Sequence, residues 1–265
     1  MSAIVIPARD EAGRILILLN QILSYSAFNP IVVVINGSID NTAAEVLSLN
    51  SLKVKALYFS DALGYDIPRA IGAHYAYNQG AHSVIFVDGD MVGDILHNLI
   101  EIDAALNSGV DLALTNCYPY ITKRQPLSAS TLKFRQLLNK KLGLYQNIGL
   151  ATPSHGLSGV SKRLMDNCHF STFAIPPTLL SIAKLNNLTV KVATAVPHLH
   201  LGSKVRGSIH ARKIAHTIIG DCIEAKCIYD GTPRTRNYLG FDYIGYNNQR
   251  RFDLLEKYLR SKSCF

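Results

Sequence analysis

Residues 84–90 read Val-Ile-Phe-Val-Asp-Gly-Asp, an apolar run that ends in two carboxylates separated by one glycine. Four apolar residues in a row predict a strand that is buried on both faces. Ligands of open α/β sheets bind at the carboxyl ends of such strands. Asp88 and Asp90 would repel each other there unless a cation such as Mg²⁺ or Mn²⁺ lay between them and shared its shell with substrate phosphates. A strand followed by an Asp-Gly turn would explain the same residues without a metal.

The first half of the chain alternates strand and helix patterns. Apolar runs predict strands over residues 3–7, 31–35, 83–87 and 112–115, and an alternating pattern predicts a short strand over 53–59. Amphipathic spacing predicts helices over residues 11–25, 40–50, 68–79 and 93–107. Such alternation is typical of an α/β protein with a doubly wound, mainly parallel sheet. The second half is less regular, with helices expected over 128–142, 177–186 and 208–228 and strands over 156–161 and 188–195.

Composition excludes several classes of protein. With 265 residues, 48% of them hydrophobic and 17% charged, the chain predicts a globular fold and not a disordered one. A strand expected from residue 3 and the lack of any apolar run near 18 residues predict neither a signal peptide nor a membrane span. The five cysteines are odd in number and form no Cys-x-x-Cys pair, so we expect reduced thiols in the cytoplasm.

Charge is distributed unevenly along the chain. Residues 1–120 hold 5 Lys+Arg and 12 Asp+Glu, a net −7, whereas residues 121–265 hold 22 Lys+Arg and 7 Asp+Glu, a net +15. The basic half predicts an anionic partner: a phosphorylated acceptor, a donor diphosphate or an anionic membrane surface. The basic residues are spread out with no nucleic-acid motif around them, so nucleic acid is not expected. A solubilising surface would explain the same charges.

Four segments follow one another in a specific order: residues 4–11 (Ile-Val-Ile-Pro-Ala-Arg-Asp-Glu), 31–42, 64–73 and the Asp-Gly-Asp strand. In this order they resemble the N-terminal half of GT-A nucleotide-sugar glycosyltransferases of the family 2 type. A weaker match continues through residues 154–159, Ser-His-Gly-Leu-Ser-Gly. The resemblance implies a GT-A fold, which is Rossmann-like, with a mainly parallel sheet flanked by helices and a more irregular acceptor-side C-terminal half.

The same resemblance implies an organisation of the chain. Residues 1–120 would be the donor-binding half and residues 121–230 the acceptor-binding half of the same domain. Residues 231–265 would form a C-terminal basic and aromatic extension. This extension could pack on the domain, form a dimer contact or touch lipid, and the sequence does not choose among the three.

A donor site for the nucleotide sugar follows from the resemblance. The residues expected to bind the donor are Pro7, Ala8, Arg9, Glu11, Asn36, Gly37, Asp66, Arg69, Asp88 and Gly89. The loop after the first strand would wrap the base, and Arg69 would bind the diphosphate with its forked guanidinium. Asn36 replaces an acid that is usual in the family, so the choice between uracil and guanine stays open. Solvated loops and tight turns would explain several of these residues equally well.

The metal site implied by the resemblance centres on the second aspartate. Asp90 would bind Mn²⁺ or Mg²⁺ directly, Asp88 would contact sugar or water, and the ion would stabilise the leaving diphosphate. The sequence His198-Leu199-His200 follows a predicted strand, and alternation would place both imidazoles on one side of an extended segment. Some GT-A enzymes take a third metal ligand from a late histidine, and we expect His198 in this role.

The catalytic base is the least defined part of the prediction. Inverting relatives carry an acid after the acceptor strand, but residues 167–220 contain no Asp or Glu. Either His155 serves, or Asp166 reaches in, or no base is needed. A missing acid with a late histidine loosely resembles the glucosyl-3-phosphoglycerate synthase type, so a retaining reaction is favoured over an inverting one. The catalytic candidates are therefore Asp88, Asp90 and His155.

The function predicted from the sequence is metal-dependent transfer of a sugar from a UDP- or GDP-linked donor to an unknown acceptor, which could be anionic or lipid-linked. We expect a cytoplasmic protein and leave open a peripheral contact with the inner face of the membrane and a homodimer. A nucleotidyltransferase on a related fold is one alternative, but its first loop should be Gly-rich and basic, whereas residues 7–13 hold one glycine and two acids. A non-enzymatic basic binding module would leave Asp88 and Asp90 unexplained.

Overall fold

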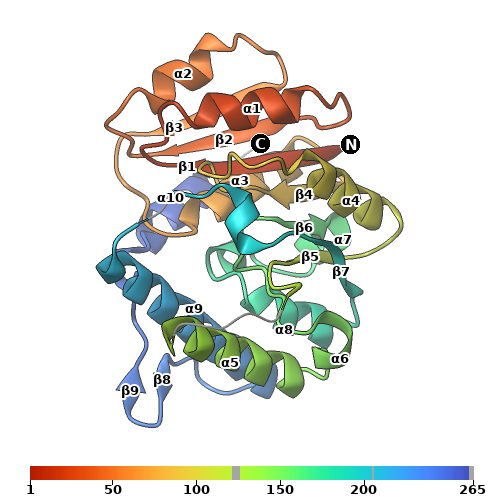
Figure 1. The fold of residues 1–265 in the computed structure, drawn as a ribbon, viewed down its shortest axis with the longest axis vertical. Helices are drawn as coiled ribbons and strands as arrows, with labels where there is room; N and C mark the ends of the chain where they lie inside the picture. Colours follow the sequence, from red (N-terminus) through yellow and green to blue (C-terminus); the bar gives the residue numbers. More distant parts are fainter. Residues whose placement is uncertain (121–125, 205, 263–265) are drawn as a thin grey trace.

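A seven-stranded sheet lies between two layers of helices in the computed structural model, which describes residues 1–120, 126–204 and 206–262 (Figure 1). The strands are β1 (Ser2–Ala8), β2 (Ile31–Asn36), β3 (Val54–Phe59), β4 (Ser83–Phe86), β5 (Leu112–Asn116), β6 (Ser158–Ser161) and β7 (Val190–Ala195). Their order across the sheet is β3-β2-β1-β4-β6-β5-β7. Only β6 runs antiparallel to its neighbours, so the predicted mainly parallel sheet is confirmed.

Two hydrophobic layers cover the two faces of the sheet, because successive residues of a strand point to opposite faces. Ile4 and Ile85 pair in register and face the layer of α1 (Ile15–Leu23), α2 (Thr42–Ser48) and α4 (Leu96–Asn107). Val5 and Phe86 face the layer of α3 (Ile67–Asn78), α8 (Thr178–Leu185) and α9 (Ser208–Asp230). The central strands are buried on both sides, as their apolar sequences predict.

Two helices of the first half begin later than the sequence pattern suggests. α1 begins at Ile15 instead of residue 11, because Asp10 and Gly13 take φ values of 55° and 77°, which a right-handed helix does not allow. α4 begins at Leu96 instead of residue 93. Between β5 and the C-terminal extension, the remaining elements are α5 (Pro126–Lys141), α6 (Tyr145–Ile148), α7 (Lys162–Asp166), η1 (Phe170–Ala174) and η2 (His198–Leu201).

The C-terminal extension packs on the domain. It forms a hairpin of β8 (Asn237–Tyr238) and β9 (Phe241–Asp242), then η3 (Asn247–Gln249) and α10 (Phe252–Lys262). Leu255 and Leu259 of α10 join the core beside α3, and the ring of Tyr258 lies 6.0 Å from that of Phe59. Of the three roles left open for residues 231–265, the described part therefore has the first, while residues 263–265 lie outside the described residues.

None of the helices in the described part of the chain combines the length and the apolar character that a bilayer crossing requires. Cys117, Cys168, Cys222 and Cys227 carry free thiols, as predicted. Cys264 lies outside the residues that the structure describes.

Candidate active site

A cleft of about 1160 Å³ opens at the carboxyl ends of β1, β2 and β4 and reaches across to α5 and α9. All but one of the residues predicted for the site line it: Pro7, Ala8, Arg9, Glu11, Asn36, Asp66, Arg69, Asp88, Gly89, Asp90, His155 and His198. Gly37 is the exception. Its φ is 57°, and a Cβ there would lie 2.7 Å from the backbone nitrogen of Ala62, so this glycine shapes the turn after β2.

The Asp-Gly-Asp segment is fastened to the loop after β1. Val87 N donates to Val5 O at 3.0 Å, and Gly89 N donates to Pro7 O at 3.0 Å. A Cβ at Gly89 would lie 2.9 Å from the same Pro7 oxygen, so only glycine allows this approach. The two aspartates therefore flank a backbone that is fixed against the loop predicted to hold the base.

Arg69 connects Asp88 to Asp66 in the wall of the cleft. Its Nη2 lies 2.5 Å from Asp88 Oδ1, and its Nε lies 3.2 Å from Asp66 Oδ1. The Arg69 side chain is only 5% exposed, whereas Asp88 is 37% exposed. Buried guanidinium groups need acidic partners, and here one of those partners is the first aspartate of the predicted metal site.

Glu11 and Asp90 form a second acidic pair, with Arg206 between them. Arg206 Nη2 lies 3.3 Å from Glu11 Oε1 and 3.6 Å from Asp90 Oδ2. Burial, followed by the charge of Asp90, raises the pKa of Glu11 to about 7. Burial and then Asp88 also raise the pKa of Asp90. The second oxygen of Glu11, Oε2, is buried without a hydrogen-bond partner, although Arg206, Lys204 and Arg14 each act to lower the pKa of this carboxyl.

These carboxylates fit a divalent cation. Their oxygens are the hard ligands that Mg²⁺ and Mn²⁺ take, and a buried oxygen without a partner is free to accept an ion. Among residues 1–120, 126–204 and 206–262, no three His, Cys, Asp or Glu side chains gather as a ready-made metal site. Magnesium-type ions commonly complete their shells with substrate phosphates and water, so the arrangement suits an ion that binds together with its substrate.

The histidine loop differs from its predicted shape. Residues 198–201 form the 3-10 turn η2 after Pro197, so the expectation of an extended segment with both imidazoles on one side is wrong. In a 3-10 turn, side chains two positions apart point in different directions. The ring of His198 lies 5.9 Å from that of His155 and close enough to Asp90 for that carboxylate to act on its pKa. His198 therefore stays the candidate ligand of the pair.

His155 lies at the inner end of the cleft beside Arg135 of α5. Arg135 Nη1 donates to His155 Nε2, and the ring of Tyr118 lies 5.4 Å from the imidazole. Burial, followed by Arg135, holds the pKa of His155 well below its usual value. The imidazole is therefore neutral, and its Nε2 lone pair is engaged by Arg135 instead of facing a hydroxyl group. A catalytic role for His155 stays a prediction.

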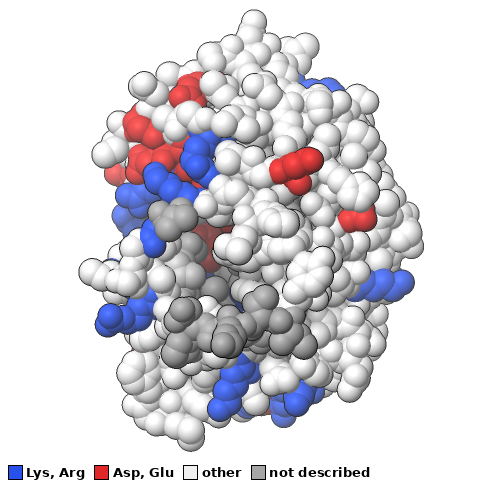
Figure 2. Space-filling view, viewed as in Figure 1, with Lys and Arg blue, Asp and Glu red and all other residues white. Residues whose placement is uncertain are grey.

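Three arginines in or next to the cleft were missed by sequence reasoning: Arg135 and Arg206 line it, and Arg250 pairs with Asp66 of its wall. Arg135 shares the buried side of α5 with Leu132 and Leu138, and a lone arginine in an apolar stripe was a signal that could have been used. Arg206 closely follows the histidine loop. Arg250 is distant from the site residues in the sequence and comes close to Asp66 only in the folded chain. In Figure 2, acidic and basic side chains gather next to each other along one edge of this face, which fits such pairing.

Comparisons with known proteins identify the fold. No family model and no curated protein sequence matches the chain. Glucosyl-3-phosphoglycerate synthase from Mycobacterium tuberculosis, solved with Mn²⁺ and UDP-glucose, superposes with a TM-score of 0.64 at 14% identity, over 89% of this chain and 81% of that one. The same enzyme with Mn²⁺, UDP and glucosyl-3-phosphoglycerate gives a TM-score of 0.62 at 15% identity, over 89% and 82%. A structure described only as a mycobacterial protein gives 0.63 at 16% identity, over 89% and 76%.

These likenesses and the sheet order show that the chain has the GT-A fold, as the sequence resemblance implied. At such low identity they establish the fold alone. What the cleft does must be argued from its own residues.

Proposed function

We propose that this protein is a glycosyltransferase that uses a divalent metal ion and a nucleotide-diphosphate sugar. The observation that carries the proposal is the position of Asp88, Asp90 and Glu11 in one cleft at the carboxyl ends of the GT-A strands. Burial and a neighbouring carboxylate raise the pKa of two of these acids, Glu11 and Asp90, and a bound cation would relieve both effects. A neighbour with the same fold was solved with Mn²⁺ and UDP-glucose, which supports a UDP-linked donor; a GDP-linked donor stays an alternative.

Each group of the donor side has a proposed role. Asp90 and His198 would hold Mn²⁺ or Mg²⁺, and the bound ion would stabilise the charge that develops on the leaving diphosphate. Arg69 would donate to a phosphate oxygen from the opposite wall. Asn36 would act indirectly, since its Nδ2 donates to Gly64 O at 3.1 Å and its Oδ1 accepts from Leu63 N at 2.6 Å. It fixes the loop beside the base instead of offering a free amide.

The acceptor side favours an anionic acceptor. Arg135 is 1% exposed, lines the cleft and has no carboxylate partner among the described residues. Its Nε and the nearby Ser154 Oγ are buried without partners. A buried cation without a counter-charge is costly, so an acceptor with a carboxylate or phosphate would complete this wall. The M. tuberculosis enzyme was also solved with phosphoglyceric acid. A lipid-linked acceptor, a membrane contact, a homodimer and a cytoplasmic location stay predictions.

The polar groups around the acceptor favour a retaining reaction. Asp166, one of the two candidate bases, bonds Lys162 and Tyr77 and does not line the cleft. The other candidate, His155, accepts a hydrogen bond from Arg135. In front-face substitution, the leaving phosphate itself takes the proton of the acceptor hydroxyl, and no base from the chain is required.

A thermal-shift panel tests the proposal. UDP, GDP, ADP and CTP are added with Mn²⁺ or with EDTA, because a ligand that binds the native state raises the melting temperature. We expect a shift with UDP or GDP that needs Mn²⁺, followed by UDP or GDP release from the matching sugar donor when an anionic acceptor is added. A larger shift with the triphosphate CTP would favour the nucleotidyltransferase, and no shift with any nucleotide would overturn the proposal.

A further inference from the structure

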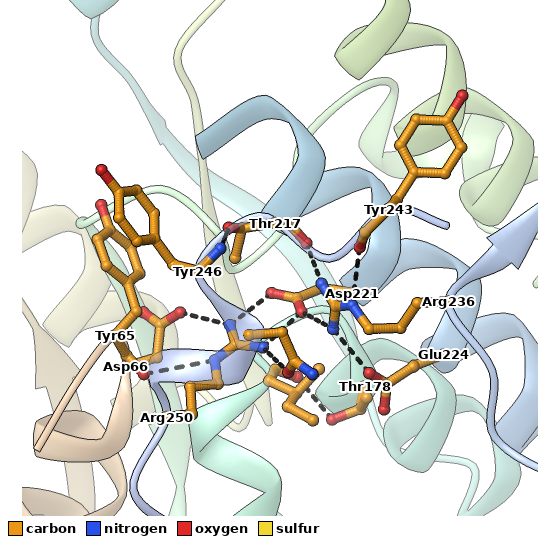
Figure 3. A network of polar contacts seen from close by, with 12 residues as sticks. Tyr65, Asp66, Thr178, Thr217, Asp221, Glu224, Arg236, Tyr243, Tyr246 and Arg250 are labelled. Atoms are coloured by element: carbon orange, nitrogen blue, oxygen red, sulfur yellow. Dashed lines mark hydrogen bonds and ion pairs between the residues drawn. The ribbon is translucent and has the colours of Figure 1, made fainter. Parts of the chain in front are cut away.

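A buried ion network connects the C-terminal extension to the cleft (Figure 3). Arg250, with a side chain 0% exposed, places Nη1 2.7 Å from Asp221 Oδ1 and Nη2 2.8 Å from Asp221 Oδ2. The same Nη2 lies 2.9 Å from Asp66 Oδ2. Arg250 therefore holds an acid of α9 with both of its Nη atoms and shares Nη2 with an acid of the cleft wall.

The network continues in both directions with charges that alternate in sign. On one side, Arg236 Nη1 contacts Asp221 at 2.8 Å and Glu224 at 2.6 Å. On the other side, Asp66 also pairs with Arg69, and Arg69 pairs with Asp88. Each of the buried acids Asp66, Asp221 and Glu224 has two arginine partners. An unbroken series of ion pairs thus runs from the extension to the first aspartate of the Asp-Gly-Asp segment.

Backbone and aromatic contacts also join residues 246–251 of the extension to residues 63–66. Arg251 N donates to Leu63 O at 2.9 Å, and a Cβ at Gly64 would lie 1.8 Å from Gln249 O. The rings of Tyr65 and Tyr246 stack with centroids 5.2 Å apart and planes 6° apart. Residues 246–251 therefore lie directly on residues 63–66, the loop that carries Asp66 to the cleft.

From this connection we infer that Arg250 is a positioning residue of the donor site. It neutralises Asp66, so that Arg69 can divide its fork between Asp66 and Asp88 and keep Asp88 oriented toward the cleft. Without Arg250, Arg69 would be the one ion-pair partner left to Asp66 among the described residues, and Asp66 would draw this guanidinium away from Asp88. The expected effect on nucleotide binding rests on the proposed function, whereas the expected effect on the order of residues 63–69 and 86–91 does not.

Arg250→Met and Arg236→Met form the matched test. Both remove a buried arginine from Asp221, but only Arg250 reaches Asp66. We expect both variants to melt lower than the wild type. Hydrogen exchange of residues 63–69 and 86–91 should rise in Arg250→Met and stay near the wild-type rate in Arg236→Met. Calorimetric affinity for UDP with Mn²⁺ should fall about tenfold in Arg250→Met alone, a coupling of the usual size between neighbouring charged groups.

Arg250→Lys is the third variant of the test. Arg250→Lys keeps the charge but not the fork, so it should fold even if Arg250→Met does not, and it should show a smaller change in the same direction. Equal exchange at residues 63–69 and 86–91 in the variants of Arg250 and of Arg236 would overturn the positioning role. If the wild type binds neither UDP nor GDP, the proposed function fails, and the exchange data still decide the role of Arg250.

Discussion

Two groups of acids in and beside the cleft are compensated by arginines to different extents. Asp66, Asp221 and Glu224 are each paired with two arginines at distances between 2.5 and 3.2 Å. Glu11 and Asp90 share a single arginine, Arg206, at 3.3 and 3.6 Å, and Asp90 Oδ2 also accepts from the backbone N of Lys204 at 3.3 Å. One oxygen of Glu11 has no partner at all. We interpret the acids with two arginine partners as structural and propose that Glu11 and Asp90 serve a ligand.

On this interpretation, the number of arginine partners distinguishes structural from functional carboxylates without reference to any relative. Removing an acid from the closed group should cost stability, because its arginines would be left buried and unpaired. Removing an acid from the open group should relieve repulsion and cost function instead. Variants of single residues in each group test this contrast.

Asp90→Asn should produce the largest functional effect. Losing the carboxylate that faces the ion should lower sugar transfer by more than about a hundredfold, beyond what the loss of an outer-shell partner of a metal costs. The melting temperature in EDTA should stay the same or rise, because the repulsion with Asp88 and Glu11 is relieved. An Asp90→Asn protein that melts lower and still transfers sugar would place Asp90 in the structural group.

Asp221→Asn should produce the largest loss of stability. It leaves Arg236 and Arg250 buried beside a neutral amide, and breaking a buried pair in this way typically costs about 3–5 kcal/mol. Urea denaturation measures the change in the free energy of unfolding. Asp253→Asn is the control, because Asp253 pairs with Arg251 at the surface with 61% of its side chain exposed, and its removal should hardly matter. Similar losses in both variants would contradict the contrast.

Glu11→Gln should stabilise the protein at high pH only. The pKa of Glu11 is raised by burial and then by Asp90 from 4.5 to about 7. A raised pKa means that the contribution of Glu11 to stability is present below pH 4.5 and is lost as the pH rises through 7. Unfolding in EDTA should therefore show Glu11→Gln to be more stable than the wild type at pH 8 and no more stable at pH 4. The same difference at both pH values would show that Glu11 is not strained by its charge.

His198→Ala should have a smaller effect on metal use. If His198 is a third ligand, the Mn²⁺ concentration for half-maximal transfer should rise about tenfold, while folding stays nearly intact. His200→Ala serves as its control, since the 3-10 turn points the two imidazoles in different directions. Unchanged metal dependence in both variants would leave Asp90 without a histidine partner and weaken the case for the retaining type.

Much of the fold could be predicted from local patterns. The apolar runs of β1, β2 and β4 are unbroken, and each leads into a loop whose polar residues line the cleft. Parallel strands bring such loops to one edge, so Glu11, Arg69, Asp88 and Asp90 could be grouped from the sequence alone. The shape of residues 198–201 could not, because Pro197 is compatible both with an extended chain and with the turn that forms.

Long-range ion pairs explain what the sequence missed. Arg250 lies 184 positions from Asp66 and 29 from Asp221, and nothing in its neighbours distinguishes it from the other arginines of a basic half. Arg206 meets Glu11 across 195 positions. The number of arginine partners of each acid depends on the folded chain, and this number distinguishes the two acidic groups.

Calorimetric titration of UDP and GDP into the wild type, first with Mn²⁺ and then with EDTA, tests most directly that the open acidic group is a metal and diphosphate site. The account predicts binding of one of the two nucleotides with Mn²⁺, weaker by at least about tenfold in EDTA, because the diphosphate would then face Asp88 and Asp90 without a cation between them. Equal affinity with Mn²⁺ and with EDTA would contradict it.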